Sequence, residues 1–414
     1  MGSVLTGLAG IVVLLSVAFL FSSHKRAINP RTILGALALQ ALIPAFVIYT
    51  DSGAATLQTI SNGVQAVIDS AQAGISFVFG PLADAKKSGF VFAIKVLPVI
   101  IFFAALMSVL YYLNIMQAVI KVMGGALQKL LKTSPVESLS ASANIFVGQT
   151  EAPLVVKPYL PTMTRSELFA VMSGGLASVA GAVLAGYASM GIGLNYLIAA
   201  SFMAAPGGLL MAKMLEPETE SPKVDMEKEI ESEQEEEAQA VNVIDAAALG
   251  ASDGLKLAAN VGAMLIAFVA LIALLNMMVG GVGGLFGFED ITIQKILGYL
   301  FAPVAFILGV PWEHATDIGS LLGIKLIVNE FVAYIDLVKM KETLDPHSMA
   351  IATVALCGFA NLSSLAILLG GLGVIAPSRR GEIATMGMKA ILAGTLSNFM
   401  SATLVGIFIA IKTM

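Results

Sequence analysis

The strongest constraint in this sequence is a series of apolar stretches, each about as long as a membrane-spanning helix. A helix needs roughly 20 predominantly apolar residues to cross a bilayer. Eight stretches meet this length, at about 4–22, 32–50, 92–114, 167–188, 194–212, 257–279, 349–372 and 384–411. Charged residues make up only 12% of the chain, against roughly 25% in soluble domains. The sequence therefore predicts an all-α polytopic membrane protein that contacts lipid.

Lysines and arginines in the short loops predict the orientation, because cytoplasmic loops carry an excess of these residues. They follow the first, third and fifth spans and precede the last one. With alternating spans, all four groups fall on one side, which we assign to the cytoplasm. Both termini are then expected outside. The groups are Lys25, Arg26 and Arg31; Lys121, Lys129 and Lys132; Lys213, Lys223 and Lys228; and Arg379 and Arg380.

Two segments, 134–161 and 311–338, do not behave as ordinary spans. Each has apolar flanks around a polar centre that carries a carboxylate, Glu151 in "GQTEAP" and Glu330 in "VNEF". Each precedes a span, 167–188 or 349–372, with a break rich in Gly, Ser and Ala near its middle. A further apolar helix then follows, 194–212 or 384–411. The repeated order predicts two re-entrant hairpins and two broken helices arranged as inverted repeats.

This arrangement indicates a polar cavity within the membrane. Non-helical backbone at membrane depth is tolerated only where protein or water surrounds it. Paired, interrupted segments in the two halves of a chain are typical of the substrate site of a secondary transporter. Carboxylates and amides form hydrogen bonds with hydroxyl and N–H groups, and no cluster of Arg or Lys faces these polar side chains. We therefore expect a polar substrate that is uncharged or weakly charged.

Structural alternatives remain open for the polar residues. Glu151 could cap a helix or pair with Lys157, and Glu330 could pair with Lys325. Asn144 could cap the hairpin tip. Polar residues of the second break could simply pack between helices, and two aromatic residues are expected to anchor the chain at the membrane interface. The packing candidates are Asn361, Ser363 and Ser364, and the anchors are Trp312 and Tyr334.

Other classes of protein fit the sequence less well. No basic stripe with interleaved aromatic residues points to nucleic acid. An intramembrane enzyme would need a nucleophile with its base, or a set of metal ligands, and neither hairpin centre contains a histidine. A passive channel for small polar solutes is a further alternative, although paired hairpins favour a carrier that encloses its substrate.

The motifs "GQTEAP", "VNEFVAY" and "GFANLSS" resemble those of the concentrative nucleoside transporter family. Similarity covers nearly the whole chain outside the acidic segment that begins at Glu216. The resemblance implies a homotrimer whose subunits each have a scaffold domain and a moving transport domain. It also implies sodium–nucleoside symport by an elevator mechanism, with a uridine-like substrate, sodium as the coupling ion and no organic cofactor. Proton-coupled nucleoside symport is the alternative.

The resemblance also assigns roles to individual residues. It implies that the first hairpin and the first broken helix hold the nucleobase, and that the second hairpin and second broken helix hold the ribose. Sodium would lie between the first hairpin tip and the first broken helix. The base residues are Gln149, Thr150, Glu151 and Val183; the ribose residues are Glu330, Phe359, Asn361 and Ser364; the sodium ligands are Asn144, Val147, Ser178 and Val179.

The expected organisation divides the chain into five parts. Residues 1–115 form scaffold helices with an interfacial amphipathic segment at 54–90. Residues 116–212 form the first transport repeat, and 213–245 form an acidic cytoplasmic linker. Residues 246–300 form a scaffold helix with a second interfacial segment at 286–297, and 301–414 form the second transport repeat.

Overall fold

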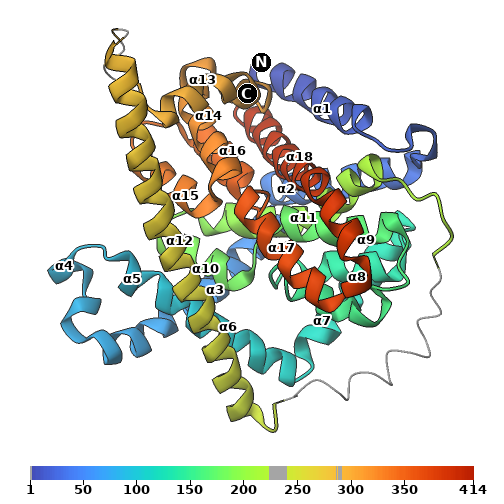
Figure 1. Cartoon of the computed structure of the whole chain (residues 1–414), viewed down its shortest axis with the longest axis horizontal. Helices are drawn as coiled ribbons and strands as arrows, with labels where there is room; N and C mark the ends of the chain where they lie inside the picture. The colour runs from blue at the N-terminus through green and yellow to red at the C-terminus, as the bar shows by residue number, and fades with distance from the viewer. Residues whose placement is uncertain (1, 223–239, 286, 288–290) are drawn as a thin grey trace.

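The computed structural model describes residues 2–222, 240–285, 287 and 291–414, and these contain helices and no strand (Figure 1). Part of the acidic linker, 223–239, and residues 286 and 288–290 of the second interfacial segment therefore lie outside the described residues. The helices are α1 (Gly2–Leu20), η1 (Lys25–Ala27), α2 (Pro30–Tyr49), α3 (Asp51–Phe79), η2 (Gly80–Ala83), α4 (Ala85–Ser88), α5 (Phe92–Lys95), α6 (Leu97–Tyr112), α7 (Ile115–Leu131), α8 (Pro135–Ala143), η3 (Ala152–Tyr159), α9 (Arg165–Ala177), α10 (Gly181–Ser189), α11 (Leu194–Leu215), α12 (Val243–Leu285), α13 (Ile293–Ile307), α14 (Trp312–Ile327), α15 (Glu330–Lys339), α16 (Pro346–Leu356), α17 (Leu362–Ile375), η4 (Pro377–Arg379) and α18 (Arg380–Lys412).

The helices separate into an inner bundle and outer helices. In the most apolar windows of the span α9–α10 and of α11, 94% of the residues are buried, and 78% are buried in that of α18. The corresponding share for α12 is only 11%. Figure 1 shows α12 along one edge of the molecule, whereas α11 and α18 lie near its centre. Apolar helices that are buried on every side form a core, whereas α12 presents an apolar surface outward.

Both predicted breaks are present. The first span ends its initial helix at Ala177 and resumes at Gly181. Gly181 donates its N–H to the carbonyl of Phe146 in the first hairpin, and a Cβ at this position would lie 2.9 Å from that same oxygen. A glycine therefore permits the close approach of hairpin and break. The second span is interrupted between Leu356 and Leu362.

The two polar-centred segments also fold back as predicted. In the first, α8 is followed by turns over residues 144–151 and then by η3, which packs against α8. In the second, α14 and α15 pack against each other on either side of a break at Val328 and Asn329. The first hairpin begins at Ser134, which starts α8 with a capping box. In the second hairpin, the Asn329 side chain caps α15 by accepting from the N–H of Val332.

The two segments predicted to lie at the membrane interface are longer and more apolar than expected. In segment 54–90, α3 and η2 form a 33-residue helical stretch whose most apolar window has a mean hydropathy of 1.3, enough to span by length and composition. Its place at the interface stays a prediction. Segment 286–297 was expected to be short, but α13 continues to Ile307 and passes the same test together with α14, to which it is bent by 116°. The expected boundary at residue 300 therefore falls inside α13. Among the described residues, eight helical stretches qualify as spans, or nine with this bent pair.

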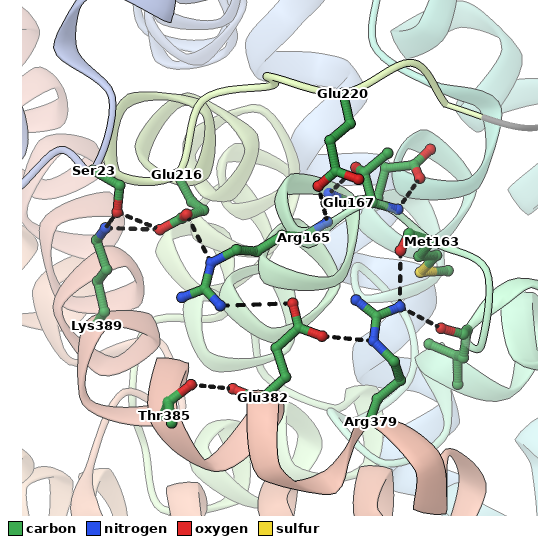
Figure 2. A network of polar contacts seen from close by, with 12 residues as sticks. Ser23, Met163, Arg165, Glu167, Glu216, Glu220, Arg379, Glu382, Thr385 and Lys389 are labelled. Atoms are coloured by element: carbon green, nitrogen blue, oxygen red, sulfur yellow. Dashed lines mark hydrogen bonds and ion pairs between the residues drawn. The ribbon is translucent and has the colours of Figure 1, made fainter.

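A network of ion pairs joins five segments at one end of the bundle (Figure 2). Glu216, just after α11, accepts hydrogen bonds from Ser23 beyond α1, from Arg165 at the start of α9 and from Lys389 on α18. Arg379 pairs with Glu382 and donates to the carbonyls of Leu160, Pro161 and Met163, where the first hairpin ends. Burial raises the pKa of Glu216, but its hydrogen bonds to Lys389, Ser23 and Arg165 outweigh this effect and hold the pKa below its usual value.

Candidate functional site

The two helix breaks meet in the centre of the inner bundle. The N–H of Phe359, in the second break, donates to the carbonyl of Ser178, in the first, over 3.1 Å. Each break leaves backbone groups without their helical partners, and most residues of both breaks are buried within the bundle. The contact brings the last turns of α9 and α16 close to the first turns of α10 and α17. The candidate site is built around this contact.

The predicted sodium ligands gather beside the first break. Asn144 is the C-cap of α8, as the structural alternative proposed, and its Nδ2 donates to the carbonyl of Ser140. This bond leaves Oδ1 turned toward Ser178, whose Oγ lies 3.4 Å away. Both side chains are 1% exposed. Neutral oxygen ligands of this kind suit a hard cation.

Two backbone carbonyls are available at the same place. Val147 lies in the hairpin turn and Val179 in the first break, and both residues are buried. Within the described residues, neither carbonyl accepts a backbone hydrogen bond. A buried carbonyl oxygen normally has a hydrogen-bond partner. Because these two oxygens lack one from the backbone, they can coordinate an ion instead. The donor set therefore fits sodium.

The tip of the first hairpin presents the residues predicted to bind the base. Gln149 is 5% exposed, its Cβ side packs on Gly175 of α9, and its Oε1 has no hydrogen-bond partner among the described residues. The side chain of Thr150 lies against Gly371 of α17. Glu151 is exposed at the surface of the subunit rather than enclosed. The tip therefore combines one buried, unsatisfied amide with one accessible carboxylate.

The second hairpin presents Glu330 to the other broken helix. Glu330 is 3% exposed; its Oε1 accepts from the hydroxyl of Tyr187 over 2.7 Å and its Oε2 from Nδ2 of Asn361 over 2.9 Å. Asn361 caps α17, because its Oδ1 accepts from the N–H of Ser364, and the same oxygen also accepts from Ser363 Oγ. Phe359 is half-buried beside them. The carboxylate is thus oriented by residues from both broken helices.

Lys325 does not pair with Glu330, so that alternative is wrong. Its ammonium donates to the carbonyl of Ala355 and to Asn398 Oδ1, and no ion pair to Lys325 occurs among the described residues. Tyr334 was expected at the membrane interface, but it is fully buried and its hydroxyl donates to the carbonyl of Thr353. Trp312 is 62% exposed, and its role as an interface anchor stays a prediction.

Sequence reasoning missed Tyr187. This residue lies one helical turn after Val183 on α10, so both occupy the same face. Both are buried, and the ring of Tyr187 also packs against Phe331 and Tyr334, with centroids 4.7 and 4.5 Å away. The only signal in the sequence is a tyrosine placed in a predicted span beyond a break. Its partner Glu330 lies 143 residues away in the chain.

Two re-entrant hairpins, two broken helices and a buried set of neutral oxygens define a membrane carrier of the secondary-transporter class. The sequence matches the family descriptions "Na+ dependent nucleoside transporter N-terminus" over residues 9–82, "Nucleoside recognition" over 93–193 and "Na+ dependent nucleoside transporter C-terminus" over 196–406. The chain belongs to the Na+-dependent nucleoside transporter family. It is therefore a multi-pass membrane transporter.

Relatives and solved structures agree with this assignment. The chain is 52% identical to the nucleoside permease NupC of Helicobacter pylori, with 99% of each covered. It is 39% identical to human solute carrier family 28 member 3, of which it spans 60%. The structure of CNTnw in an inward-facing substrate-bound state is 53% identical and matches with a TM-score of 0.94 over 99% of this chain and 98% of that one. The similarity to bacterial NupC implies the inner membrane.

Proposed function

We propose that this protein imports nucleosides together with sodium, by moving one site alternately to either side of the membrane as an elevator. The observation that carries this proposal is the contact of the two breaks through Phe359 and Ser178. One break borders the free oxygens around Asn144 and the other borders Asn361. An ion and a substrate bound there would share the same short stretch of backbone.

The nucleobase would bind at the first hairpin and α10. The free Oε1 of Gln149 can accept the N–H of a uracil-type edge, with Thr150 and Glu151 completing the polar edge. Val183 supplies an apolar surface for the ring. A base would satisfy the buried amide, which otherwise costs roughly 1–3 kcal/mol. This supports a uridine-like substrate.

The ribose would bind at Glu330, Asn361 and Ser364, with Phe359 lining the pocket. Carboxylate oxygens accept strongly from hydroxyl groups, and each Glu330 oxygen keeps acceptor capacity beyond its one protein bond. Sodium would bind through the side chains of Asn144 and Ser178 and the carbonyls of Val147 and Val179. No organic cofactor is proposed.

Uptake of radiolabelled uridine into proteoliposomes tests this proposal. Vesicles with an inward sodium gradient, an inward proton gradient or neither are compared with protein-free vesicles. We expect accumulation above equilibrium only with sodium. Accumulation with protons alone would favour the proton-coupled alternative, and uptake that only equilibrates under every gradient would favour a passive channel.

The orientation is also a proposal, with both termini outside. The ion-pair network contains three basic residues, Arg165, Arg379 and Lys389, and Lys25 in η1 lies two residues beyond its member Ser23. Cysteines introduced at exposed Thr413, just beyond α18, and at exposed Glu220, near the ion-pair network, would test it with an impermeant maleimide on whole cells. Labelling of the Glu220 position alone would reverse the orientation.

We further propose a homotrimer in which the five sequence divisions form scaffold and transport domains. The support is the exposed apolar surface of α12, which neighbouring subunits and lipid together would cover. Light scattering in detergent measures the mass of the assembly. A mass of one subunit would contradict the trimer.

A further inference from the structure

A single side-chain amide, Asn398 on α18, bonds to both helix breaks. Its Nδ2 donates to the carbonyl of Ala177 over 2.6 Å and to the carbonyl of Cys357 over 3.0 Å. Ala177 is the last residue of α9, and Cys357 is the C-cap of α16. Both hydrogens of one NH₂ group are therefore used, one for each break.

Lys325 holds this amide in place. Its ammonium donates to Asn398 Oδ1 over 2.8 Å and to the carbonyl of Ala355 over 2.7 Å. The ammonium can only donate and the two carbonyls can only accept, so the partners admit one orientation of the amide. Lys325 and Asn398 are each 2% exposed. The cluster also includes hairpin 2, since Lys325 precedes Glu330 by five residues.

The environment explains how a lone ammonium is tolerated there. Burying a charge is costly unless other groups compensate it. The carbonyl ends of α9 and α16 both point into this cluster, and helix C-termini carry partial negative charge. The ammonium is therefore compensated by two helix ends. Gly358 also lies directly against the Asn398 amide, and a side chain at position 358 would collide with that amide.

The two carbonyls that Asn398 binds belong to residues that immediately precede the two proposed binding sites in the chain. Ala177 precedes Ser178 and Val179, the proposed sodium ligands. Cys357 is followed by Phe359 and Asn361, at the proposed ribose site. A shift of either break changes the geometry of a hydrogen bond that the other break shares. Coupling between two binding sites requires a structural element whose conformation responds to both sites. The Asn398 amide, which bonds to both breaks, is such an element.

We propose that Asn398, held by Lys325, is a positioning residue that couples sodium binding to nucleoside binding. The inference rests on the proposed function, because it presumes that the two sites bind these ligands. Neither residue needs to touch either ligand. Coupling is reciprocal, so sodium should tighten nucleoside binding by the same factor as nucleoside tightens sodium binding. Loss of the amide should reduce that factor more than it reduces binding itself.

The test measures the dissociation constant of uridine from the purified protein, with and without sodium. The ratio of the two constants is the coupling factor, typically about 5–150 for coupled sites. Three variants are compared with the parent: Asn398→Leu, Asn398→Ser and Lys325→Met. Thr403→Val is the matched control, because Thr403 is buried on the same helix and, among the described residues, its hydroxyl bonds to the carbonyl of Phe399 alone.

We expect the coupling factor to fall at least fivefold in the three variants and to stay unchanged in Thr403→Val, while sodium-free binding changes by less than about threefold. Coupling factors within twofold of the parent would overturn the inference. Failure of both Asn398 variants to fold would also overturn it, since the amide would then serve the fold. A parent protein whose uridine binding ignores sodium would instead refute the proposed function.

Discussion

Replacing Glu330 by glutamine tests the ribose site without changing side-chain volume. In the free protein the carboxylate accepts from Tyr187 and Asn361. A glutamine oxygen can keep the bond from Asn361, and its NH₂ can donate to the Tyr187 oxygen, because a hydroxyl also accepts. Glu330→Gln should therefore reduce the free energy of unfolding by no more than about 1 kcal/mol.

Nucleoside affinity should change much more. Hydrogen bonds to a charged group contribute roughly 1.5–3 kcal/mol, against about 1 for neutral pairs. Removing the charge, and turning one acceptor into a donor, should cost about 1.5–3 kcal/mol of binding, or roughly 10–150-fold in the dissociation constant of uridine.

Calorimetric titration of uridine at saturating sodium measures this change, and thermal unfolding monitors stability in parallel. Glu313→Gln is the control, because Glu313 lies on the adjacent hairpin helix α14 with its side chain 77% exposed. An affinity of Glu330→Gln within twofold of the parent would remove Glu330 from the site. A large loss of stability would show that the glutamine cannot keep both bonds.

Three further outcomes follow from the structure. Asn144→Ala removes one proposed ligand and should raise the sodium concentration for half-maximal uptake by about tenfold or more; a sodium response equal to the parent's would contradict the ion site. Tyr187→Phe leaves a Glu330 oxygen without its donor and should weaken both uridine binding and thermal stability by about 1–3 kcal/mol, unless uridine itself replaces the bond, in which case only stability falls. Because the pKa of Glu216 is lower in the folded protein than its usual 4.5, the stabilisation it provides is present above about pH 4.5 and is lost as the pH falls; Glu216→Gln should show a smaller drop in melting temperature between pH 6 and pH 4 than the parent, and equal drops would contradict this role.

Local pattern was enough to predict the elements of this fold. Long apolar runs identify spans because the cost of unbonded backbone and polar groups in lipid leaves helices as the usual solution. The breaks at 178–180 and 357–361 were visible as small and polar residues within such runs. Pattern is less decisive for α3, whose window hydropathy of 1.3 reads equally as an interfacial or a spanning helix, and α13 extends to Ile307, beyond the segment expected there.

The sequence by itself determined which chemical groups the site contains: two carboxylates, several amides and hydroxyls, and two unwound helix segments. Only the tertiary structure decided how they pair. Lys325 is close to Glu330 in the chain, yet it bonds to Asn398, whereas Glu330 bonds to Tyr187, 143 residues away. The reason is that charges and hydrogen-bond capacity are properties of single residues, but partners depend on which helix ends meet. In this protein the meeting of two helix ends brings the proposed ion and nucleoside sites together.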